Sequence, residues 1–203
     1  MRIEAVFGFV IPYRGLACRN RHNRRIFSEE TVDVIGTADA IPLRNGVSDA
    51  VLSSQVIEHL PNPDLAFAET ARILKNGELL FISFPFIYPL HVAPHDYYRY
   101  SEHGFEALCR RHGFEIVEEH RLGGFWCLSS VICELYFGSF DRSVLKGVPV
   151  LALLSLPLHW LFWLLHNAES LLYRLAGNDV RDQRRGWTVN YVFVARRTAN
   201  SPT

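Results

Sequence analysis

The segment 88–100 holds the densest group of side chains able to do chemistry, with the sequence Tyr-Pro-Leu-His-Val-Ala-Pro-His-Asp-Tyr-Tyr-Arg-Tyr. A neutral histidine titrates near physiological pH and can take a proton from an acceptor hydroxyl. A neighbouring carboxylate can orient that histidine and stabilise its charged form. We therefore predict that His95 and Asp96 are a catalytic pair. The alternative is that these residues only fix a loop to the sheet.

The other polar side chains of this segment are predicted to contact a substrate. Arg99 has a planar guanidinium that favours a carboxylate or a phosphate. The residues expected to line an acceptor pocket are His91, Tyr97, Tyr98 and Arg99. His91, His95 and Asp96 also have the chemistry of metal ligands, but no clear additional ligand is spaced to join them. We therefore expect no metal site.

Two further polar groups follow apolar runs of the kind that form buried strands. Asp39 and Ala40 come shortly after the run 32–35, and Ser54 and Gln55 come directly after the run 50–53. In open α/β sheets, ligands bind outside the carboxyl ends of the strands. This placement makes both groups candidates for ligand binding. The alternatives are that Asp39 is a turn or cap residue and that the Gln55 side chain pairs with a loop.

The elements that must position these side chains alternate between strand and helix. A helix is expected between Asn62 and Leu74, with Asn62 or Asp64 as its cap, and a second from Ser101 to Arg111, ending before Gly113. The expected strands are 32–35, 50–53, 79–84 and 114–117. This order predicts the α/β class, with a Rossmann-like, doubly wound, mostly parallel sheet and helices on both sides.

The alternation stops after His120. The stretch 147–165 contains no Asp, Glu, Lys or Arg, and a strand pattern returns only at 187–195. We expect a single domain over 1–203, with a core at 32–120, an apolar helical insertion at 121–186 and a final strand at 187–196. That last strand is expected to be the antiparallel edge of the sheet.

The apolar stretch approaches the ~20 residues that cross a bilayer. Pro149 and Pro157 argue against a spanning helix, because each interrupts the backbone hydrogen bonds that lipid cannot replace. A helix or helical hairpin at the membrane surface is the favoured interpretation. Burial in the domain, a dimer contact and a true span are the alternatives.

Composition limits the partners. The chain has 21 basic and 21 acidic residues, which argues against DNA binding by counterion release. A basic run over 14–25 leaves an RNA or phosphate role as a minor alternative. Four cysteines without a CxxC pair indicate reduced thiols in a cytoplasmic protein, peripheral to the membrane if the apolar stretch binds there. No signal peptide is recognised at the N-terminus, and the sequence does not indicate an oligomeric state.

Three motifs carry a family resemblance: Asp39-Ala40, the pentapeptide Val-Ile-Glu-His-Leu at 56–60, and Leu-Lys-Asn-Gly-Glu-Leu-Leu at 74–80. Together they resemble the class I S-adenosylmethionine-dependent methyltransferases of the type 11 branch. The segment 88–100 is similar to a stretch found in a subset of these enzymes. In such proteins the residues that correspond to Glu58 and His59 stand at the start of a helix. We therefore expect Glu58 and His59 to cap a helix.

The resemblance implies S-adenosyl-L-methionine as cofactor, bound by Gly8, Asp39, Ala40, Ser54 and Gln55. Residues 1–30 resemble a degenerate or truncated version of the glycine-rich cofactor loop, since only Gly8 stands where the family has several glycines. The implied function is methyl transfer to a small-molecule or lipid-linked acceptor. The alternative is a catalytically inactive module that binds a partner or a membrane.

Overall fold

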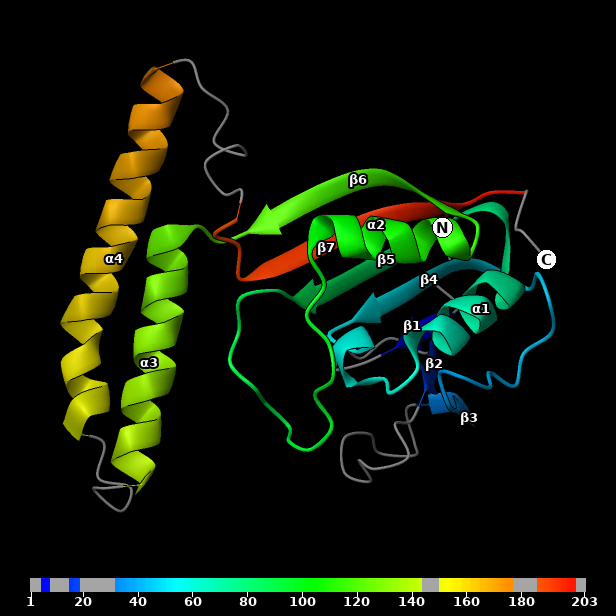
Figure 1. The fold of residues 1–203 in the computed structure, drawn as a ribbon, viewed down its shortest axis with the longest axis horizontal. Helices are drawn as coiled ribbons and strands as arrows, with labels where there is room; N and C mark the ends of the chain where they lie inside the picture. Colours follow the sequence, from blue (N-terminus) through cyan, green and yellow to red (C-terminus); the bar gives the residue numbers. More distant parts are fainter. Residues whose placement is uncertain (1–4, 8–14, 19–31, 144–149, 177–185, 200–203) are drawn as a thin grey trace. The chain divides into compact units, whose positions relative to one another are not determined.

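A computed structural model describes residues 5–7, 15–18, 32–143, 150–176 and 186–199 (Figure 1). Gly8 and the arginines of the basic run 14–25 lie outside these residues. Within them, seven strands form one sheet in the order β3-β2-β1-β4-β5-β7-β6. The strands are Ala5–Phe7 (β1), Gly15–Cys18 (β2), Val32–Gly36 (β3), Ser48–Ser54 (β4), Leu74–Pro85 (β5), Phe114–Leu122 (β6) and Asn190–Arg197 (β7).

The first five strands are parallel to their neighbours. β1 pairs with β2 and β4, β2 pairs with β3, and β4 pairs with β5. The reversal of strand order on either side of β1 and β4 makes this the switch point of a doubly wound sheet. The predicted α/β, Rossmann-like, mostly parallel fold is therefore confirmed, and the residues after β3, β4 and β5 lie at its ligand-binding edge.

β7 is antiparallel to β6. The amide of Val189, before β7, donates to Leu122 at the end of β6, whereas Thr198, after β7, donates to Gly113 before β6. The expected antiparallel strand is thus present, but it lies between β5 and β6 and is not an edge strand. Its alternating residues Tyr191, Phe193 and Ala195 are buried in the core, and its pairing on both sides gives it this inner position.

Local capping signals set the helices beside the site. α1 (Pro63–Ile73) has Asn62 as its N-cap, whose side chain accepts a hydrogen bond from the amide of Leu65. α2 (Glu102–Arg111) has Ser101 as its N-cap, bonded to the amide of Gly104. Gly113 has φ = 72°, a left-handed conformation that favours glycine and ends the helical segment.

Aromatic packing fixes α1 and α2 against the sheet. Phe67 of α1 lies 5.8 Å, between ring centroids, from Phe105 of α2, and Phe105 lies 4.7 Å from both Phe84 of β5 and Phe193 of β7. Phe84, Phe105 and Phe193 are fully buried. These contacts fix the elements that carry the candidate site.

The chain divides into two compact units. The first contains residues 1–85, 90–120 and 191–203, and the second contains 86–89 and 121–190. The second unit holds an antiparallel pair of helices, α3 (Phe125–Ser143) and α4 (Val150–Leu175), side by side in Figure 1. Ser130 of α3 is hydrogen-bonded to His159 of α4, and Trp126 stacks on Phe162. The single-domain description remains a prediction.

Within the described ranges, no helix is both long enough and apolar enough to cross a membrane.

Candidate functional site

The segment after β5 is tied to the segment after β4 by backbone hydrogen bonds. A short 3-10 helix, η2 (Ile57–His59), follows β4. The carbonyl of Glu58 accepts hydrogen bonds from the amides of Tyr97 (2.8 Å) and Tyr98 (3.3 Å). The Tyr98 hydroxyl adds a bond to the carbonyl of Pro61. Two polar segments more than thirty residues apart are thereby held together at the carboxyl ends of adjacent strands.

Asp96 organises the loop that follows β5. Its carboxylate accepts two hydrogen bonds from the Arg99 guanidinium, at 2.5 and 2.7 Å, and one from the amide of His91 at 2.9 Å. The Asp96 side chain is only 1% exposed. The hydrogen bonds from Arg99 lower the pKa of Asp96 to about 2, so the carboxylate is ionised throughout the physiological range.

Asp96 also lies beside the imidazole of His91, 3.2 Å from Nδ1. Nη2 of Arg99 lies 3.3 Å from the same nitrogen. His95 interacts through different atoms, with Nδ1 hydrogen-bonded to the Tyr97 hydroxyl at 3.1 Å. The predicted pairing of His95 with Asp96 is untested, whereas the structure brings Asp96 together with His91 and Arg99.

Glu58 is fully buried next to these groups. Among the residues that the structure describes, neither of its carboxylate oxygens has a hydrogen-bond partner. Burial raises the pKa of Glu58 to about 7, while its own backbone N–H and the nearby Arg99 charge oppose this shift. The side chain makes no capping hydrogen bond to η2, so the expectation that Glu58 caps a helix is wrong.

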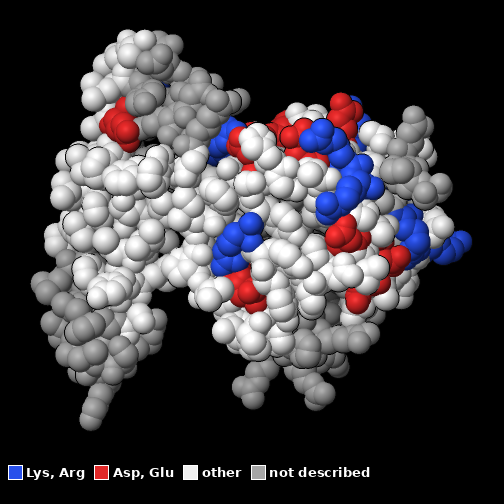
Figure 2. Space-filling view, in the orientation of Figure 1, with Lys and Arg blue, Asp and Glu red and all other residues white. Residues whose placement is uncertain are grey.

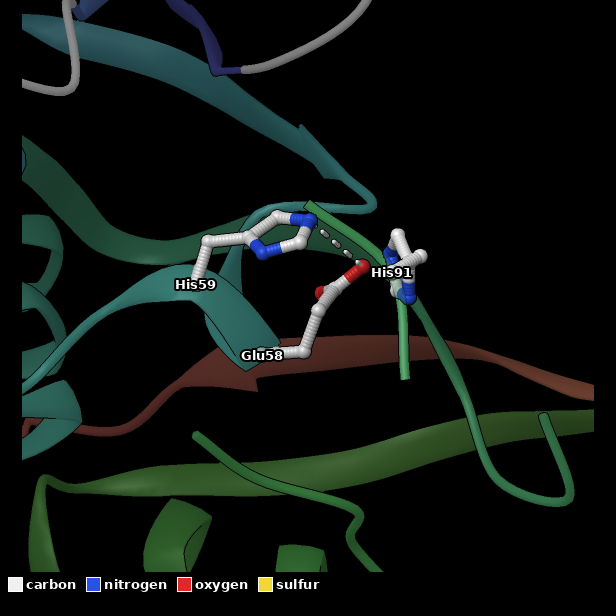
Figure 3. A group of neighbouring side chains, drawn as sticks. All are labelled: Glu58, His59 and His91. Atoms are coloured by element: carbon white, nitrogen blue, oxygen red, sulfur yellow. Dashed lines mark ion pairs between the residues drawn. The ribbon is translucent and has the colours of Figure 1, made fainter. Parts of the chain in front are cut away.

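His59 faces Glu58, with Nε2 3.7 Å from a carboxylate oxygen (Figure 3). Its Nδ1 donates a hydrogen bond to the backbone carbonyl of His95 at 2.5 Å, since a carbonyl can only accept. Burial lowers the pKa of His59, while that hydrogen bond opposes the shift. The His59 ring meets the ring of His91 edge-on, with centroids 4.8 Å apart.

The predicted polar residues after β4 contact β5. Ser54 Oγ lies 2.9 Å from Ser83 Oγ, and the Gln55 side chain donates to the same hydroxyl at 3.3 Å. Gln55 therefore pairs with a residue of the neighbouring strand β5, whereas the alternative for this residue was a loop partner. It has φ = 55°, a conformation that residues other than glycine adopt rarely.

The loop that carries Asp39 and Ala40 is held by α1. Both residues are exposed, in a turn closed by a hydrogen bond from the Ala40 amide to Thr37. Beyond the turn, Arg72 donates to the carbonyls of Ile41 and Leu43, at 2.8 and 2.7 Å. Arg72 is itself paired with Glu69, whose carboxylate accepts from the Ile41 amide. This Glu69–Arg72 clamp fixes the loop without occupying its exposed face.

A mostly apolar pocket opens next to this loop. Its lining includes Ala38 from the loop, Ser53 and Val56 from the end of β4, and Phe67 and Leu80 from α1 and β5. Its volume, about 20 Å³, is enough for about one water molecule.

Comparison with known proteins gives a family match for part of the chain. The family model described as "Methyltransferase domain" matches residues 13–82, which include β2 to β4, η2 and α1. This region belongs to the type 11 methyltransferase domain family. S-adenosyl-L-methionine is accordingly the cofactor of the domain. No match was found among curated proteins.

Solved structures agree on the fold of the methyltransferase domain. A candidate methyltransferase from Bacillus halodurans is 16% identical, with a TM-score of 0.50 over 97% of this chain and 94% of that one. The complex of the Trm112 methyltransferase activator with a candidate methyltransferase, from Haloferax volcanii, gives 15% identity and a TM-score of 0.50, with coverage of 91% and 72%. A candidate sarcosine dimethylglycine methyltransferase from Galdieria sulphuraria is 16% identical, with a TM-score of 0.47. The match covers 84% of this chain but only 61% of that protein, less than two thirds of its length.

Part of the predicted cofactor set lies among the described residues. The carboxylate of Asp39 is exposed next to Ala38 and has the chemistry to accept a hydrogen bond from an adenine amino group. The end of β4, at Ser54 and Gln55, lies next to β5 at the switch point. Gly8 directly follows β1, outside the described residues.

Sequence reasoning did not bring Glu58 and His59 together with His91. Glu58 and His59 belong to one motif, for which helix capping is expected, and His91 belongs to another, for which substrate contact is expected. The available signal was a glutamate placed among apolar residues directly after a buried strand, in Val-Ile-Glu-His-Leu. A carboxylate in such a position is seldom buried without a functional reason.

Proposed function

We propose that the protein transfers a methyl group from S-adenosyl-L-methionine to a small-molecule or lipid-linked acceptor. The observation that supports this most strongly is the convergence of the loops after β4 and β5, at the switch point of a methyltransferase-fold sheet. In this proposal the cofactor contacts Gly8, Asp39, Ala40, Ser54 and Gln55. The segment 88–100 then faces the acceptor.

The chemistry requires positioning and one proton transfer. The acceptor atom attacks the methyl carbon, a new bond to that carbon forms, and the bond to sulfur breaks with its electron pair remaining on sulfur. An acceptor hydroxyl loses its proton, which His95 takes in this proposal. Asp96 supports His95 by holding the loop through Arg99 and His91.

The acceptor contacts proposed for the same loop differ in accessibility. Tyr97 is 44% exposed and Tyr98 is 36% exposed, so both rings can meet a ligand. Arg99 and His91 are half-buried and already interact with Asp96. We therefore expect the two tyrosines to contact the acceptor directly, and Arg99 to favour an anionic acceptor mainly through its charge.

Calorimetric titration with S-adenosylhomocysteine tests cofactor use. Saturable binding with one site per chain is expected. If millimolar ligand produces neither binding heat nor a thermal shift, the result would instead support the alternative of a catalytically inactive module. In a methyl-transfer assay, His95→Ala should reduce kcat at least tenfold with little change in cofactor affinity. The matched control is His103→Ala, an exposed histidine on α2. Equal loss of turnover and cofactor affinity would show that His95 is only structural.

We also propose that the α3–α4 helix pair contacts a membrane surface of the cytoplasm. Figure 2 shows a face of these helices that is largely without charged side chains. On α4, Leu156, Trp160, Leu164, Leu171 and Leu175 are 56–75% exposed and recur at a helical spacing. Residues 156–168 include no Asp, Glu, Lys or Arg. Exposed tryptophan and leucine of this kind suit the headgroup boundary of a bilayer.

Flotation with liposomes tests this contact. The chain should float with vesicles containing anionic lipid, and the double variant Trp160→Ser, Leu164→Ser should float several-fold less. The control is Val117→Ser, an exposed apolar residue on β6. Unchanged flotation of the double variant would remove α4 from this role. If the wild-type chain forms a dimer and the double variant does not, the partner of α4 is a second copy of this chain.

A further inference from the structure

We propose that Glu58, His59 and His91 form a binding site for a divalent transition-metal ion. One ligand atom from each of the three residues lies within 4.8 Å of the other two. Bonds of ~2.0–2.2 Å to a single ion bring neighbouring ligand atoms to about 3 Å from one another. Small side-chain rotations therefore suffice to close the group around an ion. The proposal differs from the sequence expectation of no metal site, which considered only His91, His95 and Asp96.

The state of Glu58 points to a ligand. Its side chain is 1% exposed and its carboxylate lies between the rings of His59 and His91 (Figure 3). A buried carboxylate is ordinarily hydrogen-bonded or paired, because leaving it unsatisfied is unfavourable by a few kcal/mol. In the described part of the chain, both Glu58 oxygens lack a hydrogen-bond partner. A cation bound at this point would satisfy both.

The two histidines are oriented as metal-binding histidines usually are. Ligating imidazoles commonly donate their other N–H to a backbone carbonyl or a carboxylate. His59 Nδ1 donates to the carbonyl of His95, so its Nε2 lone pair faces Glu58. His91 has the carboxylate of Asp96 beside Nδ1, at 3.2 Å, and Nη2 of Arg99 at 3.3 Å from the same nitrogen. Only the Asp96 carboxylate can accept a proton from Nδ1, and in the tautomer with that proton Nε2 carries the lone pair that binds the ion.

The donor set selects the class of ion. Two imidazole nitrogens and one carboxylate suit Zn²⁺, Mn²⁺, Fe²⁺ or Co²⁺ better than Ca²⁺ or Mg²⁺, which prefer all-oxygen sites. Three protein ligands leave at least one coordination position for another molecule. This step rests on the proposed function: the acceptor occupies the open position through a hydroxyl oxygen, and the ion would lower the pKa of that hydroxyl.

Metal titration without cofactor or acceptor tests the site. Untagged, EDTA-treated protein is titrated with Zn²⁺ by calorimetry, and with Co²⁺ by visible absorption, which reports nitrogen and oxygen ligation. One ion per chain is expected, with a Kd in the micromolar range or tighter. Glu58→Gln and His91→Ala should each weaken binding at least tenfold, and Asp96→Asn should do so by roughly tenfold. His103→Ala and Glu106→Gln, exposed residues of α2, are the matched controls.

Two outcomes would overturn the proposal. One is no binding of either ion at 1 mM, and the other is binding that Glu58→Gln and His91→Ala leave unchanged. Circular dichroism in EDTA confirms that each variant is folded. If Glu58→Gln does not fold, His91→Ala decides, because the His91 side chain is 28% exposed and lies on a loop. Ion binding by a protein that does not bind S-adenosylhomocysteine in the calorimetric titration would reject the proposed function and keep the metal site.

Discussion

Replacement of Glu58 by glutamine tests whether a buried carboxylate destabilises the ion-free protein. Glutamine has nearly the same shape and is neutral at every pH. The pKa of Glu58 is raised from 4.5 to about 7 in the folded protein, mainly by burial. The folded state therefore binds more protons than the unfolded state between these values. The wild-type free energy of unfolding must fall as pH rises through this window.

The size of the effect follows from the shift. A difference of about 2.5 pKa units corresponds to about 3 kcal/mol at full ionisation, at ~1.4 kcal/mol per unit. From pH 5 to pH 8.5, the free energy of unfolding of Glu58→Gln relative to wild type should rise by about 2 to 3 kcal/mol. Any cost of burying the amide is the same at both pH values and cancels from this difference.

The assay is urea unfolding followed by tryptophan fluorescence, in EDTA, at pH 5, 7 and 8.5. Glu106→Gln is the control, because Glu106 is half-exposed and its ion pair with Arg110 is on the surface. Its difference from wild type should stay within about 0.5 kcal/mol at all three values. A Glu58→Gln difference that is constant with pH, or that falls as pH rises, would refute the reasoning. In the same assay without EDTA, added Zn²⁺ should stabilise wild type and not Glu58→Gln.

Three further predictions concern the surroundings of the site. Arg72→Met removes the clamp on the loop beside Asp39 and should weaken S-adenosylhomocysteine binding about tenfold in calorimetry. Arg72 acts on the loop through its hydrogen bonds to the carbonyls of Ile41 and Leu43. Unchanged affinity would show that other contacts fix the loop. Burial raises the pKa of Cys109 to about 12, so peptide mapping after iodoacetamide treatment of the folded protein at pH 8 should find Cys109 unmodified and Cys127 modified. Phe105→Ala removes the fully buried ring that contacts Phe84 and Phe193 and should lower the free energy of unfolding by about 3 to 5 kcal/mol in the urea assay; a loss under 1 kcal/mol would contradict the packing.

The sequence by itself determined the helices and their ends. The capping side chains of Asn62 and Ser101 are local signals, since each bonds to an amide three residues away. The apolar runs of β4 and β5 were equally clear, because a strand buried on both faces needs a continuous apolar sequence. Motifs at 39–40, 56–60 and 74–80 were sufficient to identify the family.

Tertiary structure decided what local patterns do not encode. β1 and β2 have only three and four residues and form by pairing with other strands, so no periodic signal marked them. β7 lies inside the sheet because of its pairing with both β5 and β6, which its own sequence does not specify. Glu58 and His91 are 33 positions apart, and the hydrogen bonds of Tyr97 and Tyr98 to the Glu58 carbonyl hold their segments together. The proposed metal site therefore exists only in the folded chain, because distant residues become neighbours there through non-local backbone contacts.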